Sequence, residues 1–137
     1  MSHTHDLAGF LAGLRYADLP ESVLLRTQEL FLDWLGSALA AQGAHPIPLF
    51  EAYARHMGPA SGPARILVNG AGSSAYFAAL VNAASSHLVE QDDLHNSSVL
   101  HPATVVFPAA LAAAQDLGKS GRELLLAAVA GYEAGIR

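Results

Sequence analysis

The residues best suited to chemistry in this sequence lie within fifteen consecutive positions. This stretch holds three of the seven histidines and three of the twelve acidic residues, together with one glutamine: His87, Glu90, Gln91, Asp92, Asp93, His95 and His101. No lysine or arginine occurs between positions 66 and 117, so the carboxylates have no cation nearby in the sequence. Histidine exchanges protons near neutral pH, and a neighbouring carboxylate favours its charged form. The stretch is therefore predicted to carry general acid–base chemistry.

Two other interpretations of this stretch stay open. Charged runs are usually solvated surface, which makes the segment an inert polar loop. Histidine and carboxylate groups also ligate zinc, manganese or iron, although the spacing matches no compact metal motif such as H-E-x-x-H. Two features argue against the inert loop. His87 continues the apolar helix side formed by Leu80 and Ala84, so it is expected to point inward, and His101 precedes Pro102 at the start of an apolar helix.

Closely packed helices are expected to position these residues. The 137-residue chain is 52% hydrophobic, 14% charged and 7% aromatic. It is also rich in alanine, a strong helix former and a weak strand former. A single compact all-α domain is therefore predicted. Apolar residues recur at helical spacing over positions 6–16, 20–42, 46–56, 74–88, 102–117 and 120–137. Positions 65–68 resemble a strand but are too short to anchor a sheet.

Local signals predict where several of these helices begin. Asp18, Pro20 and Glu21 form a favourable start for the second helix, with Asp18 as the N-cap. Ser120 and Glu123 have the spacing of a capping box for the last helix. Pro108 is expected to kink the helix over 102–117 or to mark its true start.

Charge and cysteine content exclude several classes of protein. The formal net charge is −5 and the seven basic residues are scattered, so nucleic acid is not an expected partner. Without cysteine there is no disulfide, thiolate zinc site or iron–sulfur cluster. The sequence shows neither a signal peptide nor an apolar run of roughly 20 residues. We therefore expect no membrane insertion and a cytoplasmic location.

Several segments of the sequence form a recognisable set of motifs. The main ones are His87-Leu-Val-Glu90-Gln-Asp92-Asp93-Leu-His95, Leu100-His101-Pro102-Ala-Thr, and Phe107-Pro108 with the alanine-rich run to Gln115. Together they resemble the MmgE/PrpD family of lyases and isomerases, and Asp33-Trp34-Leu35-Gly36 and Gly131-Tyr132-Glu133 resemble an earlier and a later helix of that family. Two positions depart from the usual pattern, because Leu94 stands where members often have threonine and Glu90 where they often have aspartate.

The resemblance implies a cofactor-free dehydratase, decarboxylase or epimerase acting on a small di- or tricarboxylate. It places the catalytic histidine of the family at His101 and its acid at Glu90. We expect Asp93 to join these two in catalysis. Asp92, His87 and His95 are expected to bind substrate, with no metal and no cofactor. The alternative functions are a helical dimerisation or interaction module without catalysis, and a His/carboxylate metal-binding enzyme.

Family members are longer than this chain, and an α+β lid completes their helical domain. Residues 1–137 are therefore expected to be the N-terminal portion of such a helical domain, with the lid absent or on another chain. A polycarboxylate substrate also needs arginine or lysine groups to hold it, and positions 66–117 offer none. We expect these cations to come from a further segment, a complementing second chain or another copy in a homo-oligomer.

Overall fold

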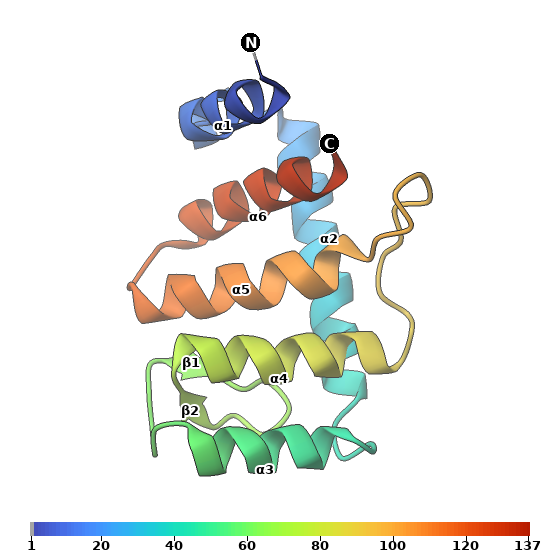
Figure 1. Cartoon of the computed structure of the whole chain (residues 1–137), viewed down its shortest axis with the longest axis vertical. Coiled ribbons are helices and arrows are strands. Elements are labelled where there is room, and N and C mark those ends of the chain that lie inside the picture. Colours follow the sequence, from blue (N-terminus) through green and yellow to red (C-terminus); the bar gives the residue numbers. More distant parts are fainter. Residues whose placement is uncertain (1) are drawn as a thin grey trace.

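The computed structural model describes residues 2–137, and six α-helices dominate it (Figure 1). They are α1 (His3–Gly13), α2 (Glu21–Ala40), α3 (Ile47–Met57), α4 (Ala75–Leu88), α5 (Pro102–Asp116) and α6 (Gly121–Ile136). A short 3₁₀ helix, η1 (Tyr16–Asp18), precedes α2. The predicted all-α class is confirmed. None of the described helices combines the length and apolar character that crossing a membrane requires.

Extended structure is limited to two short strands. β1 (Ala64–Arg65) pairs antiparallel with β2 (Gly72–Ser73), and Ala64 lies opposite Ser73. A Cβ atom added to Gly72 would lie 2.6 Å from the Gly62 carbonyl oxygen, so this close backbone approach requires glycine. Of the strand-like run at positions 65–68, only Arg65 belongs to β1, and positions 67–69 form a turn. The prediction that this run does not anchor a larger sheet is confirmed within the described chain.

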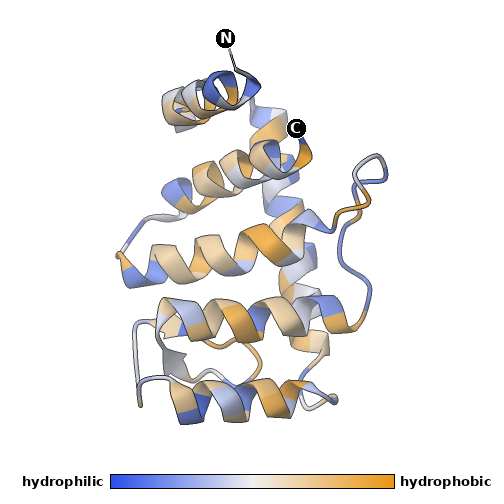
Figure 2. Ribbon diagram, in the orientation of Figure 1, coloured by the Kyte–Doolittle hydropathy of each residue, from blue (hydrophilic) through white to orange (hydrophobic). Residues whose placement is uncertain are grey.

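The helices α3, α4, α5 and α6 lie side by side in that order, and α2 crosses α4, α5 and α6 (Figure 1). Helix α1 contacts α6. Because α4 and α5 are neighbours, the end of α4 lies close to the start of α5. The connection between them, residues 89–101, projects from that edge of the molecule (Figure 1). Figure 2 shows a hydrophilic segment in the first half of this connection, after the hydrophobic end of α4.

Aromatic packing holds the start of α5 in place. The buried residues Trp34, Ala103, Phe107 and Ala128 form one cluster that joins α2, α5 and α6. The rings of Phe31, Trp34 and Phe107 lie with their centroids 5.4–5.7 Å apart. Large buried rings dominate core energetics and prefer such tilted or edge-on contacts. The first two turns of α5 are therefore fixed against α2.

The helix boundaries confirm one capping prediction, correct another and confirm the predicted start of a helix at position 102. Ser120 and Glu123 form the predicted capping box of α6. Asp18 does not cap α2, because it ends η1 and the N-cap position of α2 is Pro20, without a side-chain cap bond. Helix α5 begins at Pro102 and continues through Pro108, so Pro108 does not mark its start.

Candidate active site

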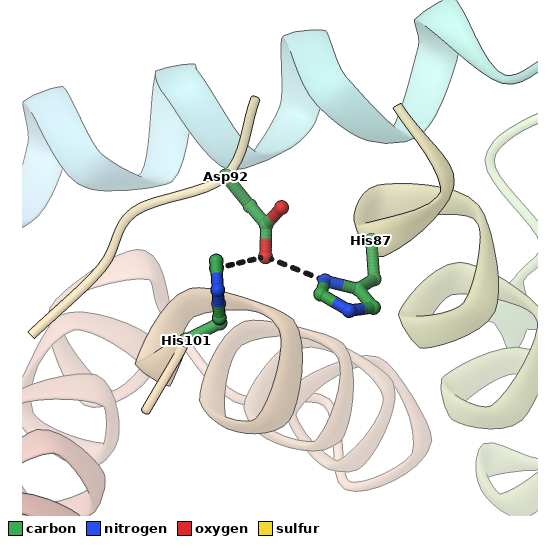
Figure 3. A group of neighbouring side chains, drawn as sticks. All are labelled: His87, Asp92 and His101. Atoms are coloured by element: carbon green, nitrogen blue, oxygen red, sulfur yellow. Dashed lines mark hydrogen bonds and ion pairs between the residues drawn. The ribbon is translucent and has the colours of Figure 1, made fainter. Parts of the chain in front are cut away.

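A buried carboxylate between two histidines forms the centre of the candidate site (Figure 3). Asp92 Oδ2 lies 3.0 Å from Nδ1 of His87 and 3.0 Å from Nδ1 of His101. The Asp92 side chain is fully buried, whereas the side chains of His87 and His101 are 52% and 34% exposed. The two imidazole rings have centroids 5.0 Å apart and planes inclined by 67°. Two solvent-accessible rings thus share one buried anion.

The two histidine contacts differ in their alignment. His87 Nδ1 and Asp92 Oδ2 are hydrogen-bonded. His101 Nδ1 lies at the same distance from Oδ2 without the alignment of a hydrogen bond, and it has no hydrogen-bond partner among residues 2–137. Asp92 Oδ1 is also buried without a partner in this part of the chain. The Asp92 carboxylate therefore lies against His101 Nδ1 at contact distance, without a hydrogen bond between the two groups.

A sharp reversal of the backbone brings Asp92 back to His87. Helix α4 ends at Leu88, and Glu90 adopts a left-handed conformation with φ of 49° while its N–H donates to the His87 carbonyl. A left-handed residue at this position is a common way to end a helix. Farther along, the N–H of His95 donates to the Leu100 carbonyl at 2.8 Å, which closes the loop and returns the chain to His101.

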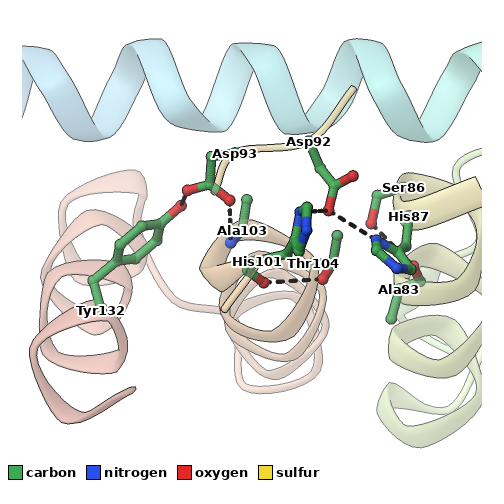
Figure 4. Close-up of polar contacts among 9 residues, drawn as sticks. All are labelled: Ala83, Ser86, His87, Asp92, Asp93, His101, Ala103, Thr104 and Tyr132. Carbon is green, nitrogen blue, oxygen red and sulfur yellow. Dashed lines mark hydrogen bonds and ion pairs between the residues drawn. The ribbon is translucent and has the colours of Figure 1, made fainter. Parts of the chain in front are cut away.

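Asp93 holds the start of α5 instead of joining the histidines (Figure 4). Its Oδ1 accepts a hydrogen bond from the Ala103 N–H at 2.8 Å, and its Oδ2 accepts one from the Tyr132 hydroxyl at 2.7 Å. His101 occupies the N-cap position of α5 but makes no side-chain cap bond. Asp93 therefore supplies the acceptor that the first turn of the helix needs.

Tyr132 contacts Asp93, although it was not among the site residues predicted from the sequence. Burial, and then the hydrogen bond to Asp93, raise the pKa of Tyr132 well above its usual range. The phenol therefore stays protonated and donates to the carboxylate. Tyr132 lies 39 residues beyond Asp93, so no local pattern links the two residues. The signal in the sequence was the resemblance of Gly131-Tyr132-Glu133 to a family helix.

The structure brings together three of the six predicted site residues, namely His87, Asp92 and His101. Glu90 is exposed at the turn after α4, and His95 is hydrogen-bonded through Nδ1 to the Ser98 hydroxyl inside the loop at 2.7 Å. The prediction that His87 points inward is wrong, because the residue is exposed. It belongs to the last turn of α4.

Comparison with known proteins gives one family. The MmgE/PrpD N-terminal domain matches residues 5–137. Two proteins of Aspergillus terreus named cis-aconitate decarboxylase are each 33% identical over 141 residues, which cover 98% of this chain and 28% of the relative. The cis-aconitate decarboxylase-like protein oryM of Aspergillus oryzae is 32% identical over 143 residues, covering 98% of this chain and 29% of that protein. The chain thus spans less than a third of the length of these relatives.

Proposed function

The chain belongs to the MmgE/PrpD family, and we propose that it carries the acid–base residues of a cofactor-free lyase acting on a small tricarboxylate. The observation that carries this proposal is the 3.0 Å contact between the buried Asp92 carboxylate and the partly exposed His101 ring. A partly exposed imidazole positioned by a buried carboxylate is suited to general acid–base catalysis.

We assign His101 as the general acid and base at a carbon next to a substrate carboxylate. The buried Asp92 carboxylate lies 3.0 Å from Nδ1 of His101 and, in this proposal, keeps the imidazole in one position. His101 stands at the N-terminal end of α5, where the helix dipole favours an anion nearby. A carboxylate of the substrate can therefore approach the ring from the solvent side.

Among dehydration, epimerisation and decarboxylation, the names of the similar Aspergillus proteins favour decarboxylation. In that reaction the bond between the substrate carbon and one carboxylate breaks, and CO₂ leaves without the bonding electron pair. The pair remains on the carbon and takes a proton from protonated His101 to form the new C–H bond. Water then returns a proton to His101. In dehydration or epimerisation the same ring would instead remove a proton from carbon.

The other predicted residues take different roles in this proposal. Glu90 and His95 belong to the connection between α4 and α5, and together with His87 they are assigned to contact substrate or water. Asp93 is a positioning residue, since both of its oxygens are hydrogen-bonded to the protein. The cations that bind the substrate carboxylates are proposed to come from outside this chain, because positions 66–117 contain no lysine or arginine.

The test is the replacement His101→Ala, assayed with cis-aconitate in the protein together with the segment or partner that completes it. We expect turnover to fall by about a hundredfold or more. The melting temperature should change by only a few degrees, since the His101 side chain makes no cap bond. His56→Ala, an exposed residue in the last turn of α3, serves as the matched control. A His101 variant that keeps more than about a tenth of wild-type kcat would overturn the acid–base assignment.

An interaction module without catalysis is the second candidate. It is favoured by the exposed residues Leu25, Leu32 and Leu39, which recur every seven positions along α2 and so share one face. The same assay separates the two candidates. If the completed wild-type protein shows no turnover of small polycarboxylates, the interaction module replaces the lyase.

A further inference from the structure

We propose that His87, Asp92 and His101 bind a divalent transition-metal ion such as Zn²⁺, and that this ion inhibits the enzyme. One ligand atom from each residue lies within 4.8 Å of the other two. Asp92 Oδ2 is 3.0 Å from each of the two Nδ1 atoms. Ligands bound about 2.1 Å from one zinc ion are separated by roughly 3.0–3.5 Å. The two separations between Asp92 Oδ2 and the histidine nitrogens therefore already match those of ligands that share one ion.

Unsatisfied atoms at the same place give a second reason. The Asp92 carboxylate is fully buried, and its Oδ1 has no hydrogen-bond partner in the described chain. His101 Nδ1 is also without a hydrogen-bond partner there, although it lies at contact distance from Oδ2. A buried charge is costly unless it is paired and hydrogen-bonded. A divalent cation would neutralise Asp92 and bind His101 Nδ1, which no hydrogen bond occupies.

The donor set selects the kind of ion. Two imidazoles and one carboxylate suit Zn²⁺, Co²⁺, Ni²⁺ or Fe²⁺, whereas Mg²⁺ and Ca²⁺ prefer sites made only of oxygen atoms. Three protein ligands are typical of zinc sites that keep one open position. His87 is half exposed, so the ion can enter from solvent and hold water at the open position.

The chemistry of imidazole explains why such an ion would inhibit, and this step rests on the proposed function. A neutral imidazole that binds a metal through Nδ1 carries its remaining proton on Nε2. That ring has no free lone pair to accept a proton, and it cannot become the imidazolium that donates one. Metal and catalytic proton therefore compete for His101. The ion is expected to be an inhibitor that a chelator removes.

Binding is tested by isothermal titration calorimetry of the chain with ZnCl₂. The background is a His3→Ala, His5→Ala double variant, because these exposed histidines of α1 provide a separate source of zinc ligands. We expect one ion per chain. The replacement His87→Ala should weaken binding at least about tenfold, and so should Asp92→Asn. His95→Ala and His56→Ala are the controls and should leave the affinity unchanged.

Circular dichroism confirms that each variant is folded. His87 is half exposed, so its loss does not leave a buried cavity, and this variant decides the outcome if Asp92→Asn fails to fold. The site is overturned if the parent takes up no zinc, or if His87→Ala binds zinc as tightly as the parent does.

Inhibition is tested separately with cis-aconitate in the completed enzyme. Activity without added metal that falls on addition of Zn²⁺ and returns with a chelator supports the inference. Activity that persists with zinc bound overturns the inhibition and leaves the proposed function intact. A protein that is inactive without metal and activated by Zn²⁺ overturns both the inhibition and the cofactor-free assignment, while the measured binding site stands.

Discussion

Tyr132 donates a 2.7 Å hydrogen bond to Asp93 and so ties the last helix to the connection that carries the site. The other oxygen of Asp93 accepts from the N–H of Ala103, two residues after His101. The position of α6 is therefore transmitted to the start of α5, and from there to the His101 ring. Asp93 and Asp92 are adjacent in the chain, yet one stabilises the scaffold and the other contacts the histidines.

This clamp, the pair of hydrogen bonds from Ala103 and Tyr132 to Asp93, predicts the effect of replacing Tyr132. The variant Tyr132→Phe keeps the ring that packs against Phe107 but leaves one Asp93 oxygen without its donor. We expect a loss of about 1–3 kcal/mol in the free energy of unfolding, measured by urea denaturation. Tyr76→Phe changes an exposed tyrosine and should have almost no effect. Equal stabilities for the wild type and Tyr132→Phe would contradict the clamp.

The backbone and the side chain of Glu90 predict separate effects on stability and on activity. Glu90 has a φ of 49°, a region where glycine is favoured and other residues are strained. The variant Glu90→Gly should be more stable than Glu90→Ala by about 1 kcal/mol in urea denaturation. Both should lose activity in the completed enzyme, because both lack the carboxylate that we assign to the substrate or water. Full activity of either variant would remove Glu90 from the site.

The capping box of α6 predicts a pH-dependent stability. Hydrogen bonds from the backbone and hydroxyl of Ser120, and then the contact with Lys119, lower the pKa of Glu123 from 4.5 to about 2. Because the folded-state pKa is lowered, the contribution of this charge is complete above about pH 4.5 and disappears as the pH falls towards 2. Salt should reduce this contribution, since Glu123 is exposed.

The variant Glu123→Gln isolates that charge, because glutamine keeps an acceptor for the cap. Its urea midpoint should lie below that of the wild type at pH 7, and the difference should narrow between pH 4.5 and pH 2. A difference between the two midpoints that stays constant over this range would show that the charge has no part in capping α6.

Removal of metal should leave the activity intact. The proposed chemistry needs only the exchange of protons at His101 and no Lewis acid. Extensive dialysis of the completed enzyme against a chelator should therefore preserve kcat with cis-aconitate. Loss of activity that zinc, iron or manganese restores would establish the metal-dependent alternative in its place.

The apolar face of α2 predicts that the isolated chain associates. Leu25, Leu32 and Leu39 form an exposed row on this helix, and soluble monomers rarely leave such rows uncovered. Sedimentation velocity should show a species larger than a monomer, and Leu32→Glu should shift it towards monomer. Leu117→Glu, at the exposed end of α5, is the matched control. A stable wild-type monomer that binds polycarboxylates with micromolar affinity would contradict this prediction.

The sequence by itself determined the helical class, the approximate span of each helix and the segment that carries the site. These features are local, because they depend on apolar residues at helical spacing, on the capping residues Ser120 and Glu123, and on the cluster of histidines and acids after α4. The motif around His101 and Pro102 also indicated the family, which the match over residues 5–137 confirms.

Only the tertiary structure decided which carboxylate contacts the histidines and which one holds the start of α5. Asp92 and Asp93 are the same residue type at adjacent positions, and nothing local distinguishes them. Their roles follow from the packing of α5 against α6, which brings Ala103 and Tyr132 to Asp93 from 10 and 39 residues away. Asp92 contacts two histidines on either side of it in the chain. His87 lies in the last turn of α4, and His101 lies at the N-cap position of α5. Contacts of such long sequence separation arise from the packing of whole helices, and no local pattern of residues encodes them.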